Sequence, residues 1–155
     1  MTATAKMIMT TPAVSVTERQ TIKDVIELLA KNNFSGVPVV DDNNIVVGIL
    51  SNTDIIRYSQ QVSVVPFADL SGWISPYTDV TDLAALRQGI DLITRTTAAE
   101  IMTRKVYTAT EDTPVTELAR LMSRRRINRV PIVDAAGKLI GIVTRADLVK
   151  SMAGE

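Results

Sequence analysis

One repeat with a constant offset constrains the fold of this chain more than any other feature. Met102 lies 93 residues after Met9, and this offset aligns IMTRKVYTATE with IMTTPAVSVTE. The same offset places VPIVD at 130–134 on VPVVD at 37–41. About fifty residues align without a gap, which indicates a tandem duplication. Each copy, at roughly 55 residues, is too small to bury a comfortable core alone, so we expect the copies to pack together.

The first half of each copy predicts a strand followed by an amphipathic helix. The stretches AVSV at 13–16 and VYTA at 106–109 are rich in β-branched and aromatic residues, which is typical of strands. Apolar residues then recur at helical spacing over 21–33 and 113–125. We therefore expect the same strand–helix order in both copies.

Both of these helices carry start signals. Thr21 and Asp24 match a capping box with Asp in place of Glu, which predicts a helix start at Thr21. Thr113 and Pro114 predict a hydroxyl cap followed by a proline in the first turn. The run SRRRINR at 123–129 follows the second helix, and we expect its arginines to form a solvated helix C-terminus rather than a nucleic-acid patch.

The second half of each copy predicts a hairpin and a final helix. The segments VPVV at 37–40 and VPIV at 130–133 each contain a proline, which indicates an edge, a strand start or a bulge because proline cannot donate to a sheet ladder. The turn residues DDNN and DAAG separate them from the apolar runs IVVGIL and LIGIV. The glycine within each run indicates a close approach by another group. A helix that begins at Ser51 or Thr144 completes an α+β fold with the order strand, helix, strand, strand, helix.

These signals divide the chain into a first repeat at 1–58, an insert at 59–98 and a second repeat at 99–155. The insert is partly helical, because apolar residues recur at helical spacing over 81–93. Its first part, SQQVSVVPFADLSGWISPYTD at 59–79, has mixed character and predicts no element.

Composition excludes several classes of function. The 17 basic and 17 acidic residues give zero net charge and only 4% of residues are aromatic, which argues against a nucleic-acid partner. The chain has no cysteine and no histidine, so disulfides, Cys/His metal sites and His-based general bases are excluded. No nucleophile–base pair or metal-ligand spacing is present, so we expect neither an enzyme nor a catalytic cofactor. We find no signal peptide and no apolar run of about 18 residues, so we expect no membrane partner and a cytoplasmic location.

The motifs GILSNTD and GIVTRAD admit two interpretations. Ser51 with Asp54, and Thr144 with Asp147, have the spacing of a helix cap in which hydroxyl and carboxylate accept from early amides. The start of a helix also offers free amides to a phosphate, and a carboxylate one turn later accepts hydrogen bonds from two ribose hydroxyls. The two interpretations are compatible, and the spacing alone leaves both open.

The combination of VPVVD with GILSNTD, repeated at a constant offset, resembles a tandem CBS-domain pair, named after cystathionine β-synthase and also called a Bateman module. The resemblance covers both repeats and leaves out the insert. It implies a three-stranded sheet with packed helices in each repeat, and a pseudo-twofold axis between the repeats. It also implies clefts between the repeats that bind adenine nucleotides or S-adenosylmethionine, and a homodimer of four repeats.

The same resemblance implies which residues contact the ligand. One cleft has Thr144 and Asp147 at its ribose and Asn128 or Arg129 at its phosphate, and the other has Ser51 and Asp54. The opposite repeat also contributes residues to each cleft. In the first cleft these are Thr10, Val14, Phe34, Ser35 and Gly36. In the second cleft they are Thr103, Tyr107, Ile127 and Asn128. The apolar walls are Val37, Ile49, Val130 and Ile142, which also suit a core. Because Gly36 stands where the other repeat has Arg129, we expect the cleft with Arg129 to bind ligand better.

We therefore expect a regulatory module without chemistry of its own. Its ligand is AMP, ADP, ATP or S-adenosylmethionine, and binding shifts the repeats or subunits so that a partner protein responds. The alternative from another class is a ligand-free dimeric scaffold, in which both motifs are only helix caps.

Overall fold

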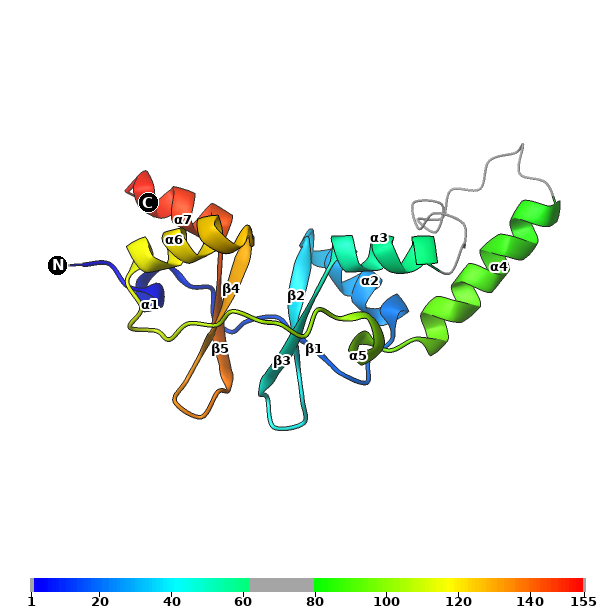
Figure 1. Ribbon diagram of the computed structural model, residues 1–155, viewed down its shortest axis with the longest axis horizontal. Coiled ribbons are helices and arrows are strands. Elements are labelled where there is room, and N and C mark those ends of the chain that lie inside the picture. The colour runs from blue at the N-terminus through cyan, green and yellow to red at the C-terminus, as the bar shows by residue number, and fades with distance from the viewer. Residues whose placement is uncertain (1, 62–79, 155) are drawn as a thin grey trace. The chain divides into compact units, whose positions relative to one another are not determined.

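The computed structural model describes residues 2–61 and 80–154 of the 155 (Figure 1). They form two compact units, and each unit takes segments from both sequence repeats. The described residues of unit 1 are 2–15, 40–47 and 105–154, and those of unit 2 are 16–39, 48–61 and 80–104. The segment that precedes each repeat's first strand therefore folds into the unit that holds the other repeat's helices.

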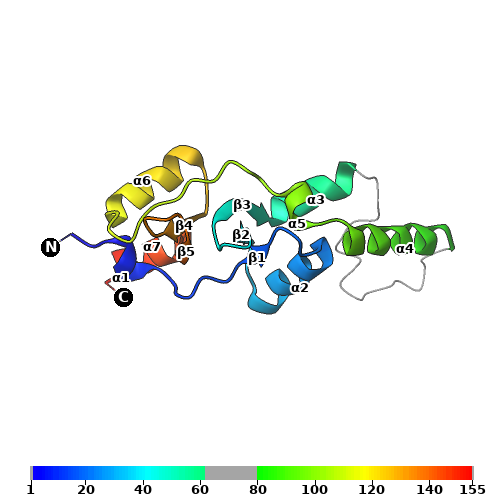
Figure 2. The ribbon, with the colours of Figure 1, turned by 90° about the horizontal axis from the view of Figure 1, so that it is seen from below.

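Unit 1 contains two helices that cover an antiparallel hairpin, together with a short N-terminal helix. Its elements are α1 (Ala5–Ile8), α6 (Val115–Arg125), β4 (Arg129–Val133), β5 (Leu139–Thr144) and α7 (Arg145–Met152). Helix α6 packs on α7 and β4, and α1 packs on α7 (Figures 1 and 2). The core consists of buried apolar side chains from all five elements: Ala5, Leu118, Met122, Val130, Ile132, Val143 and Leu148.

The described residues of unit 2 form a three-stranded sheet of order β1-β2-β3 and four helices. Its elements are β1 (Val16–Thr17), α2 (Ile22–Asn32), β2 (Gly36–Val40), β3 (Val46–Ser51), α3 (Asn52–Gln61), α4 (Val80–Arg95) and α5 (Ala98–Ile101), although the β2–β3 loop belongs to unit 1. Helix α4 packs on α2, and α5 packs on α3. The predicted helix at 81–93 is thus confirmed, and residues 62–79 of the predicted insert lie outside the described residues.

The predicted first strands are shorter than expected. In the first repeat the strand is reduced to Val16–Thr17, and in the second only Ala109 makes a parallel bridge, with Ile132. The Ala109 amide donates to the Pro131 carbonyl at 3.1 Å, and the Val133 amide donates to the Ala109 carbonyl at 2.9 Å. Pro131 therefore turns its nitrogen, which has no hydrogen, toward this neighbour, and the ladder cannot extend past it.

The hairpins form as predicted. Strands β4 and β5 are antiparallel with Arg129 opposite Thr144, and a bulge lies between Ile132 and Val133. In the turn, the Asp134 carboxylate accepts from the amides of Ala136 and Lys138, at 2.9 and 3.0 Å. Asp41 does the same in the first repeat, so these aspartates fix the turns by local hydrogen bonds.

The predicted helix starts have different outcomes. The Thr21–Asp24 capping box is present, with reciprocal bonds of 3.2 Å, and α2 starts as expected. The prediction for α6 was wrong, because Pro114 itself is the N-cap and no side chain caps the helix. The Thr113 hydroxyl instead accepts from the Thr110 amide at 3.1 Å, in the turn before the helix.

The glycines of the third strands lie under methionines of the IMT segments, which confirms the expected close approach. A Cβ on Gly141 would lie 2.7 Å from the Met9 sulfur, and a Cβ on Gly48 would clash with the Met102 sulfur. The next residue, Thr10, exchanges two backbone hydrogen bonds with Ile142, of 2.9 and 3.2 Å. This packing brings the IMT threonine of each unit to the strand that leads into the S/T-x-x-D motif.

Candidate functional site

The Thr144–Asp147 motif of unit 1 is a complete capping box at the start of α7. The Asp147 Oδ2 atom accepts from the Thr144 amide at 2.8 Å and from its hydroxyl at 3.0 Å. The Asp147 amide in turn donates to Thr144 Oγ1 at 3.3 Å. Thr144 is the last residue of β5 and has extended backbone, so the chain turns directly from strand to helix there. The cap interpretation of the sequence is therefore correct for this motif.

Several of the predicted ligand residues surround this cap within unit 1. Arg129 lies opposite Thr144 in the β4–β5 register. The Asn128 carbonyl accepts from the Arg145 amide at 2.9 Å, which ties the start of β4 to the start of α7. Thr10 is held on β5 by its bonds to Ile142, two residues before the cap. Unit 1 thus combines a carboxylate, hydroxyls and an arginine at one helix start.

The equivalent motif of unit 2 is organised differently. The Asp54 Oδ2 atom accepts from the Ser51 amide at 2.9 Å and from the Ser51 hydroxyl at 3.1 Å. Its Oδ1 atom accepts from the Thr103 hydroxyl at 2.8 Å and lies 3.5 Å from an Arg57 guanidinium nitrogen. Thr103 is held on β3 by two backbone bonds to Ile49, of 2.8 and 2.9 Å. The Asp54 side chain is only 5% exposed.

Arg57 was not among the residues predicted from the sequence. Its position three residues after Asp54 in α3 brings a cation onto the carboxylate, and this i, i+3 spacing was a readable signal. The equivalent residue in the second repeat is Lys150, 93 residues later.

Some predicted residues have other neighbours within their own unit. The Ser35 carbonyl accepts from the Asn52 amide at 2.9 Å, so Phe34–Gly36 lies at the start of α3 in unit 2. Tyr107 lies in unit 1, where its ring centroid is 4.8 Å from the Arg125 guanidinium. The predicted groupings of Phe34–Gly36 with Asp147, and of Tyr107, Ile127 and Asn128 with Asp54, join residues of different units and stay predictions.

Two of the four predicted apolar walls, Val37 and Val130, are core residues. Val37 is 1% exposed and Val130 is fully buried. Ile127 is partly buried and packs against the core of unit 1. Ile49 and Ile142 are partly buried, whereas Val14 is exposed. Burial of Val37 and Val130 removes their side chains from any open surface, so the core explains their presence without a ligand.

The two motifs also differ in the charge around them. Three positions near the cap carry arginine in the second repeat and a neutral residue in the first, namely Arg126, Arg129 and Arg145 against Asn33, Gly36 and Asn52. Only the pair of Gly36 and Arg129 entered the prediction, although all three pairs can be read from the offset of 93 residues. At these three positions the second repeat therefore carries three more positive charges than the first.

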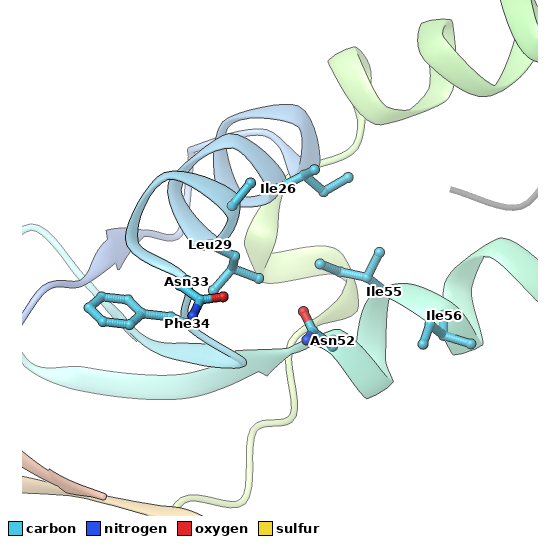
Figure 3. Close-up of a pocket in the computed structure, with 8 residues that line it drawn as sticks. Ile26, Leu29, Asn33, Phe34, Asn52, Ile55 and Ile56 are labelled. Carbon is cyan, nitrogen blue, oxygen red and sulfur yellow. The ribbon is translucent and has the colours of Figure 1, made fainter. Parts of the chain in front are cut away.

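An apolar groove lies elsewhere in unit 2, between α2 and α3, and encloses about 380 Å³. In Figure 3, Ile55 of α3 extends toward Ile26 and Leu29 of α2. Phe34 and Ile56 also line the groove, and both are exposed large apolar side chains. Exposed apolar surface of this kind is typical of an interaction surface.

Two negative findings apply to the part of the chain that the structure describes. Within 2–61 and 80–154, no group of three or more His, Cys, Asp or Glu side chains is placed to hold a metal ion. None of the helices described there combines the length and the apolar character that crossing a membrane requires.

These features define a tandem module of two repeats, and the described residues of each repeat contain a short helix, two longer helices, a hairpin and an S/T-x-x-D motif at a helix start. The sequence model of the CBS domain matches residues 5–61 and again residues 98–154. The chain belongs to the CBS-domain family and contains a pair of these domains.

The curated relatives include proteins of very different length. An uncharacterised protein of Methanocaldococcus jannaschii, MJ1426, is 34% identical over 151 residues, which cover 95% of this chain and 89% of that protein. The L-aspartate semialdehyde sulfurtransferase of the same organism is 30% identical over 150 residues. This match covers 97% of the chain but 23% of the sulfurtransferase, so it relates the chain to one part of a larger protein.

Two similar solved structures contain adenosine compounds. The crystal structure of CBSX2 in complex with AMP has a TM-score of 0.71 and 27% identity, and covers 98% of this chain and 97% of that chain. CBSX2 is a protein of Arabidopsis thaliana. The CBS domain pair of the protein MJ0100, in complex with 5-methylthioadenosine and S-adenosyl-L-methionine, has a TM-score of 0.70 and 29% identity. This alignment covers 99% of the chain and 98% of the MJ0100 chain.

Proposed function

We propose that this chain is a regulatory module that binds an adenosine-containing ligand at the Thr144–Asp147 cap and signals to a partner protein. The complexes of CBSX2 with AMP and of MJ0100 with S-adenosyl-L-methionine support this class of ligand. The observation that carries the proposal is that one oxygen of the Asp147 carboxylate is available to a ligand. Its Oδ2 atom serves the cap, and no donor among the described residues bonds its Oδ1 atom.

The available oxygen suits a ribose. Asp147 is partly exposed, so its Oδ1 atom can accept from a ribose hydroxyl while Oδ2 keeps the helix cap intact. Such a charge-assisted hydrogen bond is stronger than a bond between neutral groups. Thr10, exposed and paired with β5 at Ile142, adds a second hydroxyl near the end of this strand.

The charge around the cap favours a ligand with phosphate. Arg129 lies opposite Thr144, and Arg145 follows Thr144 directly. The amides at the start of α7 add positive dipole character. AMP, ADP and ATP present a phosphate to these groups, whereas S-adenosylmethionine presents a sulfonium cation. We therefore place AMP, ADP and ATP ahead of S-adenosylmethionine for this chain.

A thermal-shift panel tests the proposal. AMP, ADP, ATP and S-adenosylmethionine are added separately to the wild-type chain, to Asp147→Ala and to Asp112→Ala, which alters an exposed aspartate of the same unit. A nucleotide at a hundredfold excess over its Kd adds about 2.7 kcal/mol to the free energy of unfolding, which raises the midpoint by several degrees. We expect the shift in the wild type and in Asp112→Ala and its loss in Asp147→Ala. A flat response of the wild type to all four compounds would contradict the proposal.

The partner and the assembly are further parts of the proposal. The chain is proposed to act in the cytoplasm as a homodimer, and ligand binding changes the surface that an effector protein contacts. Ile56 and Val149 occupy equivalent positions of the two repeats, and both are exposed apolar residues. Apolar exposure repeated at equivalent positions favours a second copy as the partner of these helices. Light scattering after size exclusion measures the mass, and Ile56→Lys should shift it toward the monomer.

The groove between α2 and α3 favours a second candidate, a ligand-free scaffold. In this alternative both S/T-x-x-D motifs are only caps and the apolar groove provides the function. The same thermal-shift panel separates the candidates. A scaffold shows no midpoint shift with any adenosine compound, yet loses its self-association when Ile56 is changed to lysine.

A further inference from the structure

The two repeats carry the same motif, but their carboxylates differ in what they already bind. Both oxygens of Asp54 are engaged, since Ser51 donates to Oδ2 and the Thr103 hydroxyl donates to Oδ1 at 2.8 Å. The Arg57 guanidinium lies 3.5 Å from the same Oδ1 atom. With 5% exposure, the carboxylate has little surface left for a further donor. Within unit 2 the carboxylate is satisfied by the protein itself.

The equivalent carboxylate in unit 1 keeps one oxygen available. Thr144 occupies Asp147 Oδ2, and in the part of the chain that the structure describes no side chain donates to Oδ1. Thr10 is the equivalent of Thr103 and makes the same backbone pairing with its strand. Its hydroxyl, however, makes no bond to Asp147. Lys150 stands at the position of Arg57 and forms no ion pair with Asp147 at 4.0 Å or less.

We propose that Thr103 and Arg57 close the site of unit 2, so that each chain binds one equivalent of nucleotide, at Asp147. This inference rests on the proposed function. A ribose that approaches Asp54 must displace the Thr103 hydroxyl, so one charge-assisted bond replaces another with little gain. At Asp147 the ribose adds a bond to an oxygen that accepts from no side chain among the described residues. The two sites therefore differ in whether the ligand must first break a hydrogen bond that the carboxylate already makes.

The charged residues beside the two motifs also favour nucleotide binding at Asp147 over Asp54. Arg129 and Arg145 adjoin the cap of unit 1, whereas Gly36 and Asn52 occupy the equivalent positions of the first repeat. Arg57 supplies a cation in unit 2, but its nitrogen is turned onto Asp54 rather than toward a phosphate. At these positions the positive charge favours a phosphate beside Thr144 over one beside Ser51.

Isothermal titration of the full chain with AMP tests the number of sites. We expect one equivalent per chain in the wild type. Asp147→Asn, which keeps the shape of the side chain, should weaken that binding at least about tenfold, because a bond to a charged acceptor is lost. Two equivalents in the wild type, or one undiminished equivalent in Asp147→Asn, would overturn the inference while leaving nucleotide binding established. Absence of any binding by AMP or ATP would overturn the proposed function together with it.

A second variant tests the closure itself. Thr103→Val with Arg57→Ala removes both donors from Asp54 Oδ1 and keeps the branched shape at position 103. We expect a second, weaker equivalent of AMP in this variant, and a thermal unfolding curve confirms that it remains folded. The control is Thr94→Val with Arg95→Ala, the same substitutions at exposed positions of α4 in unit 2, which should leave the single equivalent unchanged. A Thr103→Val, Arg57→Ala chain that still binds a single equivalent would show that these residues do not close the site.

Discussion

At the scale of single residues, two helix ends show how the same fold tolerates different side chains. Asn33 and Arg126 are the C-cap residues of α2 and α6, at equivalent positions of the two repeats. Both have left-handed backbone, with φ of 55° and 56°. Both residues pay the steric cost of a Cβ in this conformation, but the short polar side chain of asparagine can offset it by local hydrogen bonding, whereas the long arginine side chain does not. The second repeat therefore has an unfavourable residue at a position that suits glycine or asparagine.

Arg126→Gly should raise the free energy of unfolding by about 0.5–1 kcal/mol, because glycine adopts left-handed backbone without a Cβ penalty. Urea denaturation measures the change. Arg124→Gly is the matched control, since it removes the same charge from the last turn of α6, where the backbone is helical. That variant should lose about 1 kcal/mol, the helix-propensity cost of glycine. If both variants lose stability equally, the backbone conformation at Arg126 is not the cause.

At the scale of elements, a glycine in the third strand of each repeat leaves room for the methionine of an IMT segment. In unit 1 the Met9 side chain covers Gly141, and the Thr10 carbonyl lies 3.2 Å from where a Cβ would be. A backbone carbonyl cannot move aside as a flexible side chain can. A Cβ on Gly141 therefore requires the Met9 side chain to move and the Thr10 carbonyl to shift by a few tenths of an ångström.

Gly141→Ala should lower the free energy of unfolding by about 1–3 kcal/mol, the usual cost of an overpacked contact. Met9→Ala in the same chain removes the nearer part of the clash. Because the two residues touch, the double variant should lose less than the sum of the two single variants. Denaturation of all four proteins in urea gives this coupling energy. Additive losses would mean that the methionine does not pack on the glycine.

The local elements could be predicted from the sequence because their signals are local. The capping box at Thr21, the turn aspartates and the glycine in each third strand all depend on residues a few positions apart. The first strands and the α6 cap could not be predicted in the same way. Pro131 lies far from Ala109 in the sequence, yet it stops the pairing of the strand around Ala109. The Thr113 hydroxyl bonds within the turn before α6 instead of capping the helix.

At the candidate site, the sequence predicted the cap at Thr144 and the pairing of Thr103 with Asp54 in one group. It did not predict that Asp54 is occupied while one oxygen of Asp147 remains available. That difference depends on side-chain orientation and on Arg57 reaching back to Asp54, and neither follows from the repeat, which makes the two motifs look alike.

At the scale of the whole molecule, the boundaries of the folded units differ from the boundaries of the sequence repeats. Ala5 precedes the first repeat's strand, yet it is fully buried in the core of unit 1, among residues of the second repeat. Its amide donates to the Thr113 carbonyl at 2.8 Å, and the Val115 amide donates to the Ala3 carbonyl at 3.0 Å. The N-terminal segment is therefore part of the fold of the second repeat.

Because the N-terminal segment packs in unit 1, a substitution at Ala5 should destabilise elements of the second repeat that lie more than a hundred residues away in sequence. Ala5→Asp introduces a charge into the apolar core of unit 1 and should lower its stability by more than about 3 kcal/mol. Met7→Asp is the control in the same short helix, because Met7 is 64% exposed and its replacement should change stability by less than about 0.5 kcal/mol. Hydrogen exchange should show faster exchange in α6 and β5 of Ala5→Asp, while α2 and β2 keep their protection. If α2 and β2 lose protection and α6 does not, the N-terminal segment stabilises its own repeat and the exchange of segments is contradicted.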